Sequence, residues 1–163
     1  MSTLVTRFAL AGTDGEVSPV RRKVVEQVRA WGVPLDDETA DVIRLVASEL
    51  ITNAVVHGEG PVTVALYHRP GSLVIDVLDA NPVAPKTSCA EADDESGRGL
   101  ELVDVLAVRS GWEPSDRGKH VWAELALPKP APAFRAAVLR RFFGVRHGAD
   151  VRAAPKALVL AVA

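Results

Sequence analysis

The feature that most constrains the fold is a change of hydrophobic period on either side of Gly58. Residues 42–56 are apolar on almost every side of a helix, and a helix of that kind is buried over most of its surface. Residues 62–67 and 73–78 instead place an apolar residue at every second position on either side of a turn, which predicts a β-hairpin. A buried helix followed directly by a hairpin predicts helices packed against a sheet.

Weaker periodic signals supply the rest of the secondary structure. Residues 4–10 predict a first strand, and Ser18-Pro19 opens an amphipathic helix that Gly32 ends. Residues 99–107 predict a third helix and residues 108–127 a closing hairpin. Hairpins make a sheet antiparallel, so the predicted fold is α+β. It is a two-layer α/β sandwich with a mixed, mostly antiparallel sheet covered by helices on one face.

The length of 163 residues predicts one domain with a tail. Prolines at positions 128, 130 and 132 separate a domain, residues 1–128, from a tail, residues 129–163. The domain carries 12 Lys and Arg against 20 Asp and Glu, a balance of −8, and the tail carries 7 against 1, a balance of +6. An acidic domain disfavours direct binding of nucleic acid.

Cysteine content and hydropathy predict where the protein resides. The single cysteine, Cys89, excludes an internal disulfide and fits a reducing compartment. No apolar run approaches the ~20 residues of a transmembrane segment, and the N-terminus lacks the apolar stretch of a signal peptide. We therefore expect a soluble cytoplasmic protein.

Two polar residues interrupt the buried helix. Glu49 and Asn53 are four residues apart, so they share one helix face. Burying an unbonded polar group costs about 2–7 kcal/mol, which a bound metal and a reacting group would offset. The alternative is that both are ordinary polar residues on a partly exposed face.

Two further candidate sites follow, one at the end of the first hairpin and one after the long polar segment. Asp79 ends its strand on the core side, where its carboxylate could accept a hydrogen bond from an exocyclic amine; alternatively it only starts a turn. Gly97-Arg98-Gly99-Leu100 opens a helix, and a helix N-terminus with nearby glycines suits a phosphate. By itself this pair of glycines is weak evidence, and it matches neither the dinucleotide fingerprint nor a P-loop.

Taken together, these segments resemble the GHKL ATP-binding superfamily, which includes gyrase, MutL and the sensor histidine kinases. Residues 48–58, Ser-Glu-Leu-Ile-Thr-Asn-Ala-Val-Val-His-Gly, look like its N-box, and Gly-Arg-Gly-Leu at 97–100 follows in the family's order. Residues 18–22 and 118–125 look like its opening and closing segments. The likeness covers about residues 5–127 and is closest to small bacterial proteins related to anti-sigma-factor serine/threonine kinases.

The resemblance implies a Bergerat ATP-binding fold, ATP and Mg²⁺ as ligands, and a role for each matching residue. Glu49 is then the general base, Asn53 the Mg²⁺ ligand and Asp79 the acceptor for the adenine amine. The remaining nucleotide contacts fall on Asn81, Gly97, Arg98, Gly99 and Leu100, and residues 83–96 form the ATP lid.

Two positions depart from the family's pattern. Asn81 stands where a glycine is usual, and His120 stands where relatives often carry a threonine beside the adenine site. Asn tolerates unusual backbone angles better than most residues, so the turn can survive the first change.

Two functions are compatible with this pattern. The leading hypothesis is an anti-sigma-type serine/threonine kinase, which phosphorylates a small antagonist protein and binds a sigma factor. The alternative is a nucleotide-binding interaction module that transfers no phosphate. A histidine kinase is disfavoured because no helix with a phospho-acceptor histidine precedes the domain, and gyrase- or MutL-type enzymes need a longer chain.

The tail combines an apolar helical stripe with positive charge. We consider three roles for it: docking on the acidic domain, a homodimer or client contact, and attachment to a membrane surface. The stripe consists of Phe134, Val138, Phe142 and Val145.

Overall fold

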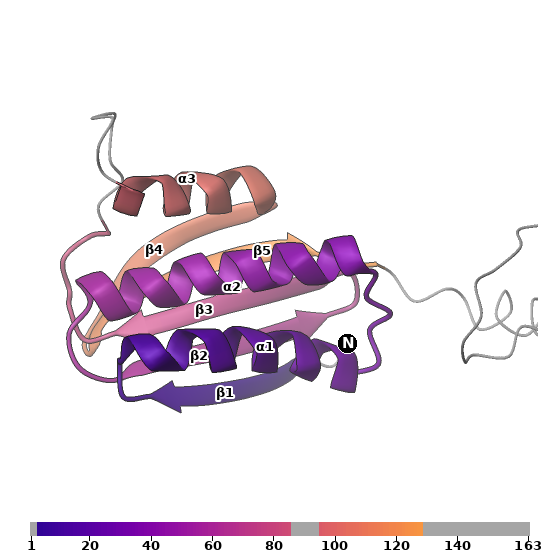
Figure 1. Ribbon diagram of the computed structural model, residues 1–163, viewed down its shortest axis with the longest axis horizontal. Coiled ribbons are helices and arrows are strands. Elements are labelled where there is room, and N and C mark those ends of the chain that lie inside the picture. The colour runs from indigo at the N-terminus through magenta and orange to yellow at the C-terminus, as the bar shows by residue number, and fades with distance from the viewer. Residues whose placement is uncertain (1–2, 86–94, 129–163) are drawn as a thin grey trace, which may run out of the picture. The chain divides into compact units, whose positions relative to one another are not determined.

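A five-stranded sheet with three helices makes up the part of the chain that the computed structural model describes, residues 3–85 and 95–128 (Figure 1). The predicted tail and residues 86–94 of the predicted lid lie outside the described residues. In chain order the elements are β1 (Leu4–Leu10), α1 (Asp14–Ala30), α2 (Asp37–His57), β2 (Val62–Arg69), β3 (Ser72–Asp79), α3 (Glu95–Leu106), β4 (Arg109–Ser115) and β5 (Gly118–Ala126).

The strands lie in the order β1-β2-β3-β5-β4, and each neighbouring pair is antiparallel. Two hairpins, β2–β3 and β4–β5, meet side by side where β3 pairs with β5. This pairing sets Val77 opposite Val121 and Asp79 opposite Lys119. The end of β3 and the start of β5 are therefore held together at one end of these two inner strands.

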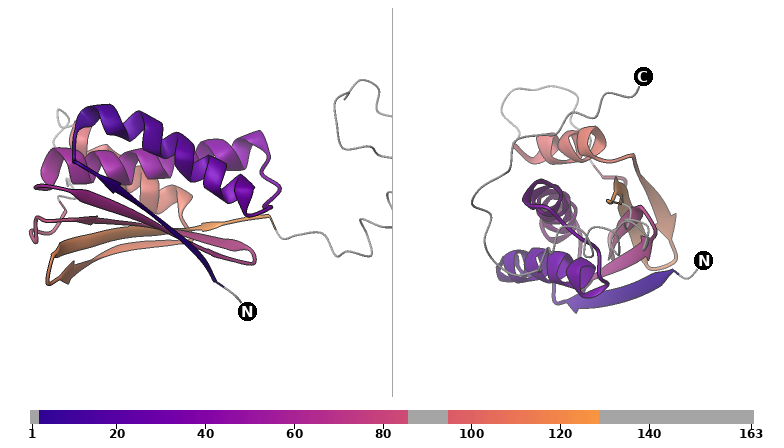
Figure 2. Two further views of the ribbon diagram at one scale, coloured as in Figure 1. Left: turned by 90° about the horizontal axis from the view of Figure 1, so that it is seen from below. Right: turned by 90° about the vertical axis from the view of Figure 1, so that its right-hand side faces the viewer.

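All three helices cover the same face of the sheet (Figure 2). The central helix, α2, contacts α1, α3 and the strands β2, β3 and β5, so it is the middle of the helical layer. Its buried side chains meet the apolar face of the strands, which includes Val64, Leu66, Ile75 and Val121. The predicted α+β fold, a two-layer sandwich with helices on one face, is confirmed.

The start of α1 differs from the prediction. The helix begins at Asp14 rather than at Ser18, because a capping box at Thr13 and Glu16 starts it one turn earlier. The Glu16 carboxylate accepts hydrogen bonds from the backbone N–H groups of Ala11, Gly12 and Thr13, each at 3.1 Å. Pro19 consequently lies inside the helix. Ser18-Pro19 is an acceptable helix start in the sequence, but the Thr13–Glu16 capping box precedes it and forms more hydrogen bonds.

The start of α3 also moves. It begins at Glu95, so residues 97–100 lie in its first two turns rather than ahead of it. The strands predicted at 62–67 and 73–78 and the hairpin predicted within 108–127 agree with the structure to within a few residues. No helix among the described residues has the length and hydropathy needed to cross a membrane.

Candidate functional site

The predicted N-box and the predicted glycine motif meet at one cavity. Glu49 and Asn53, from the second half of α2, line a cavity of about 230 Å³ together with Gly99 and Leu100 from α3. The remaining lining residues are Thr52, Val56 and His57. Two segments separated by more than forty residues in the sequence thus form the walls of one site between α2 and α3.

Asn53 is buried at this cavity, with 8% of its surface exposed. The alternative of an ordinary, partly exposed polar residue therefore does not hold for Asn53. Its side-chain Nδ2 is buried, and no described residue accepts a hydrogen bond from it. A buried donor without a partner costs about 1–3 kcal/mol, so this amide fits a site at which a ligand completes the hydrogen bonding.

Glu49 is held against the backbone of α3 because position 99 has no side chain. A Cβ atom added to Gly99 would lie 2.2 Å from the Glu49 Oε2 atom. Leu100, the next residue, is 9% exposed and belongs to the hydrophobic core, which anchors this part of α3. The backbone of Gly97 and Arg98 lies in the first turn of the same helix.

Asp79 lies at the end of β3 on the helix-covered face, as the alternation predicted, and is 1% exposed. Its two carboxylate oxygens differ in their surroundings. Oδ1 accepts hydrogen bonds from the Asn81 backbone N–H at 2.9 Å and from the Lys119 Nζ at 2.9 Å. Oδ2 is buried, and no described residue donates to it. The predicted turn is thus present, and the second oxygen is buried without a partner among the described residues.

Asn81, at the position where a glycine was expected, connects two loops. Its Nδ2 donates to the backbone oxygen of His57 at 2.9 Å, and its Oδ1 accepts from the backbone N–H of Val83 at 3.0 Å. These bonds tie the end of α2 to the segment after β3. The asparagine side chain therefore stabilises the turn that carries Asp79.

Lys119 is the site residue that the motif comparison missed. Its side chain is 1% exposed and forms an ion pair with Asp79, and its Nζ also donates to the backbone oxygen of Asn81 at 3.0 Å. A signal was present in the sequence: Lys119 has the same strand parity as Val121, Ala123 and Leu125, which all face the core. Alternation alone would have placed this lysine inside.

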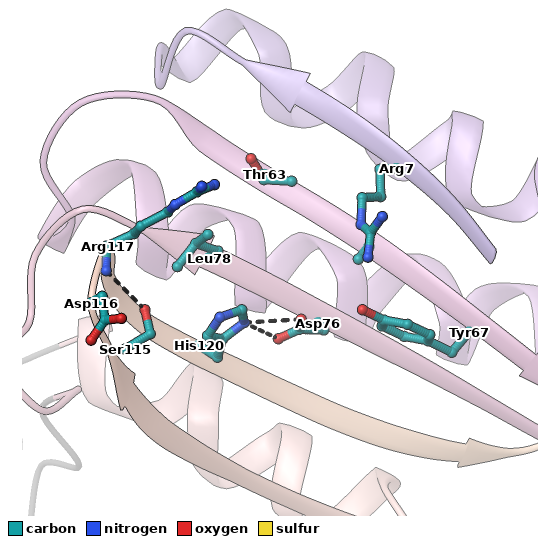
Figure 3. A pocket seen from close by; sticks show the side chains of 10 residues that line it. Arg7, Thr63, Tyr67, Asp76, Leu78, Ser115, Asp116, Arg117 and His120 are labelled. Atoms are coloured by element: carbon teal, nitrogen blue, oxygen red, sulfur yellow. Dashed lines mark hydrogen bonds and ion pairs between the residues drawn. The ribbon is translucent and has the colours of Figure 1, made fainter.

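His120 lies on the face of the sheet opposite to Asp79, so the expectation that it stands beside the predicted adenine acceptor is wrong. Figure 3 shows it turned toward Asp76, and its Nδ1 lies 3.0 Å from both carboxylate oxygens. Burial raises the pKa of Asp76, and the hydrogen bond with His120 acts in the opposite direction. The two residues line a separate cavity of about 510 Å³ with Arg7, Tyr67 and Arg117. This larger cavity contains none of the predicted site residues.

The donor set around the α2–α3 cavity fits a nucleotide better than a metal held by protein alone. Among the side chains that the structure describes, those of residues 3–85 and 99–128, no three His, Cys, Asp or Glu gather as a potential metal site. Asp79 does not line this cavity, but it lies against Gly58, the residue that follows the lining residue His57. The unpartnered amide of Asn53 and the unpartnered carboxylate oxygen of Asp79 suit a ligand that brings both acceptors and donors. Phosphate oxygens and an exocyclic amine have these properties.

Comparisons with known proteins agree with this geometry. A profile of the histidine kinase-like ATPase domain family matches residues 10–125. The Mycobacterium tuberculosis protein "Sensor histidine kinase component HK1" is 28% identical over 111 residues, which covers 58% of this chain and 65% of that protein. The crystal structure of the RsbU and RsbW domains of Rv1364c from the same organism has a TM-score of 0.56 at 21% identity, covering 78% of this chain and 34% of that one. The chain spans less than two thirds of either relative, and the structural likeness is one of fold.

Proposed function

Because the chain belongs to the histidine kinase-like ATPase domain family, we propose that it binds Mg-ATP at the α2–α3 cavity and transfers the γ-phosphate to a serine or threonine of a protein partner. The observation that carries the proposal is the meeting of Glu49, Asn53 and Gly99 at one cavity, where the Asn53 amide lacks a partner among the described residues.

Glu49 is the proposed general base. Its carboxylate lies at the cavity wall and accepts the proton of the attacking hydroxyl. The hydroxyl oxygen forms the new bond to the γ-phosphorus, while the bond to the bridging oxygen breaks and its electron pair leaves with ADP. Such a transfer needs positioning more than covalent chemistry, and a rigid helix next to Gly99 supplies a fixed base.

Asn53 is the proposed protein ligand of Mg²⁺. Mg²⁺ is typically held by one or two protein groups together with substrate phosphates, and it neutralises their charge. Rotation of the amide about the Cβ–Cγ bond presents either its oxygen to a cation or its N–H to a phosphate. The side-chain amide of Asn53, together with the phosphate oxygens of the nucleotide, is therefore sufficient to hold the cation.

The rest of the nucleotide is assigned to the two ends of the site. Asp79 is the proposed acceptor for the adenine amine, since its Oδ2 is buried without a donor among the described residues. The N-terminal turn of α3, which contains Gly97 and Arg98, is proposed to hold the phosphates through its free backbone N–H groups, and Gly99 and Leu100 are proposed to line the phosphate end of the cavity. Asn81 supports the base end by holding the turn after Asp79.

The proposed partners are a small antagonist protein, which is phosphorylated, and a sigma factor, which is bound. The motifs shared with anti-sigma-factor serine/threonine kinases support this choice, and so does the likeness in fold to a structure that contains an RsbW domain. A homodimer is part of the same proposal.

Two substitutions test the assignment. Asn53→Ala is expected to weaken ATP binding by tenfold or more, roughly 1.4 kcal/mol, in the presence of Mg²⁺ and to change it little in EDTA. Glu49→Gln is expected to bind ATP like the wild type and to transfer no phosphate. Glu38→Gln, exposed in the first turn of the same helix, is the matched control and should behave as the wild type. Calorimetry gives the affinities, and radiolabelled ATP with candidate partner proteins gives the transfer.

Each result has a defined meaning. Unchanged Mg²⁺-dependent affinity in Asn53→Ala would contradict the metal assignment. Phosphate on the partner that is lost in acid would indicate a histidine acceptor instead of serine or threonine. A wild-type protein that binds ATP but transfers nothing to any candidate would support the alternative, a non-catalytic nucleotide-binding interaction module.

A further inference from the structure

The ion pair between Asp79 and Lys119 is buried more completely than stability alone explains. The two residues are direct partners across β3 and β5, and the Lys119 and Asp79 side chains are 1% and 0% exposed, with Nζ 2.9 Å from Oδ1. Removing two charges from water costs several kcal/mol per ion, and apolar residues of similar volume often replace such pairs without loss of stability. Neither residue lines the α2–α3 cavity, but Asn81, which Lys119 contacts, donates to the backbone oxygen of the lining residue His57. This connection points to a role for the pair in the candidate site.

The lysine makes the two oxygens of Asp79 unequal. Oδ1 receives the ammonium group and the Asn81 N–H, whereas Oδ2 receives no donor from the described residues. Because Lys119 also donates to the Asn81 backbone oxygen, it is anchored at a second point and cannot swing to Oδ2 without breaking a bond. The carboxylate is thus oriented with one defined oxygen left for a ligand donor.

The backbone around Asp79 leaves this carboxylate little room to turn. A Cβ atom on Gly58 would lie 2.9 Å from both the Cβ and the Cγ of Asp79, and one on Gly118 would lie 1.9 Å from its backbone oxygen. Gly118 also has a φ of 134°, which L side chains rarely adopt. The backbones of Gly58 and Gly118 therefore pack closely against Asp79 and restrict its movement.

The orientation of the Asp79 carboxylate bears on which purine it can bind. A carboxylate oxygen accepts hydrogen bonds, so it pairs with the 6-amino group of adenine and opposes the 6-oxo group of hypoxanthine or guanine. If the carboxylate turned freely, neither oxygen would be held as the acceptor for that amine. The preference for a 6-amino purine therefore depends on what orients Asp79.

We propose that Lys119 is a positioning residue for base selection: it holds the Asp79 carboxylate so that Oδ2 is the one acceptor offered to the base, and the site therefore prefers 6-amino over 6-oxo purine nucleotides. This inference rests on the proposed function, since it deepens the assignment of Asp79 to the base. It concerns a residue that acts through another and does not itself need to touch the nucleotide.

The test compares ATP with ITP, which differ at position 6 of the purine, in calorimetric titrations of the whole chain. The wild type should prefer ATP, and Lys119→Met and Lys119→Gln should each reduce that preference by roughly tenfold or more. Lys119→Met removes both the charge and the donor, and Lys119→Gln removes the charge while keeping a donor. Lys23→Met, exposed on α1, is the matched control and should keep the wild-type ratio.

The ratio of the ATP affinity to the ITP affinity separates base selection from a merely structural role of Lys119. If both Lys119 variants bind ATP and ITP more weakly by the same factor, the preference is intact and the inference is overturned. If Lys119→Met fails to fold, as judged by circular dichroism, Lys119→Gln decides by the same ratio. A wild-type protein that binds neither nucleotide overturns the proposed function itself. This outcome is distinguishable from variants that bind both nucleotides more weakly but keep the wild-type preference.

Discussion

Replacing Gly99 with alanine should raise stability and impair phosphate transfer at the same time. Gly99 lies within α3, and a glycine-to-alanine change inside a helix is worth about 0.4–1 kcal/mol because alanine loses less backbone entropy on folding. For a chain of this length that corresponds to a melting temperature higher by roughly 1–4 °C. From helix propensity alone, Gly99→Ala would be a stabilising change.

The same substitution should displace the carboxylate of Glu49. The new methyl group would lie 2.2 Å from the Glu49 Oε2 atom, whereas ordinary contact begins at 3.4 Å, so the carboxylate must retreat by about 1.2 Å. A flexible side chain can make that movement without disturbing the helix. A misplacement of about 1 Å at a reacting group can lower a rate by about 10²-fold. We therefore expect the rate of phosphate transfer to fall by about this factor with little change in ATP affinity.

The assay pairs thermal unfolding with single-turnover transfer from radiolabelled ATP. Gly15→Ala is the control, because it lies in α1 and a Cβ there meets nothing within 4 Å. It should match the wild type in transfer. A Gly99→Ala variant that transfers at the wild-type rate would refute the reasoning that Gly99 exists to seat Glu49. A lower melting temperature would show that the helix, and not the side chain, gives way.

Two further predictions concern the capping box and the tail. Hydrogen bonds, led by the one from the Thr13 backbone, lower the pKa of Glu16 from its usual 4.5, so their contribution to stability is present above that pH and is lost as the pH falls through the lowered value. Glu16→Gln should accordingly lower the denaturation midpoint at pH 7 and differ less from the wild type at pH 3; a constant difference would contradict this. Deleting residues 129–163 should leave ATP affinity unchanged in calorimetry, because every proposed ligand precedes Pro128, and light scattering should report any change in self-association. Lost affinity in a folded truncation would place the tail in the site.

The fold was accessible from the sequence because its main signals are periodic. The alternating strands at 62–69 and 72–79 and the apolar helix α2 each present a face that only a sheet–helix sandwich can bury. The start of α1 was less accessible, since Ser18-Pro19 and Thr13–Glu16 are both acceptable caps and only hydrogen-bond geometry decides between them. Two helix-start sequences close together in the chain can both fit a cap, whereas hydrophobic periodicity is supported by every residue of a helix or strand.

The sequence predicted which candidate residues lie together where helical spacing brings them together, but it did not identify the partner of Asp79, which depends on pairing across the sheet. Glu49 and Asn53 share a face through helical spacing alone, so their meeting at one cavity needed no tertiary information beyond the approach of Gly99. The partner of Asp79 depends on the register between β3 and β5, which joins residues forty positions apart.

The choice between Lys119 and His120 shows how strand parity outweighs motif position. A motif comparison placed His120 beside the adenine site, but neighbouring residues of a strand point to opposite faces, and a shift of one residue exchanges the two environments. Val121, Ala123 and Leu125 are buried, so the inward position before them belongs to Lys119 and the outward one to His120. The inward position is opposite Asp79, where only a cation balances the buried carboxylate. The surroundings of Asp79 are therefore defined by a charge pair across two strands, and a comparison that aligns residue types without assigning their faces will not detect it.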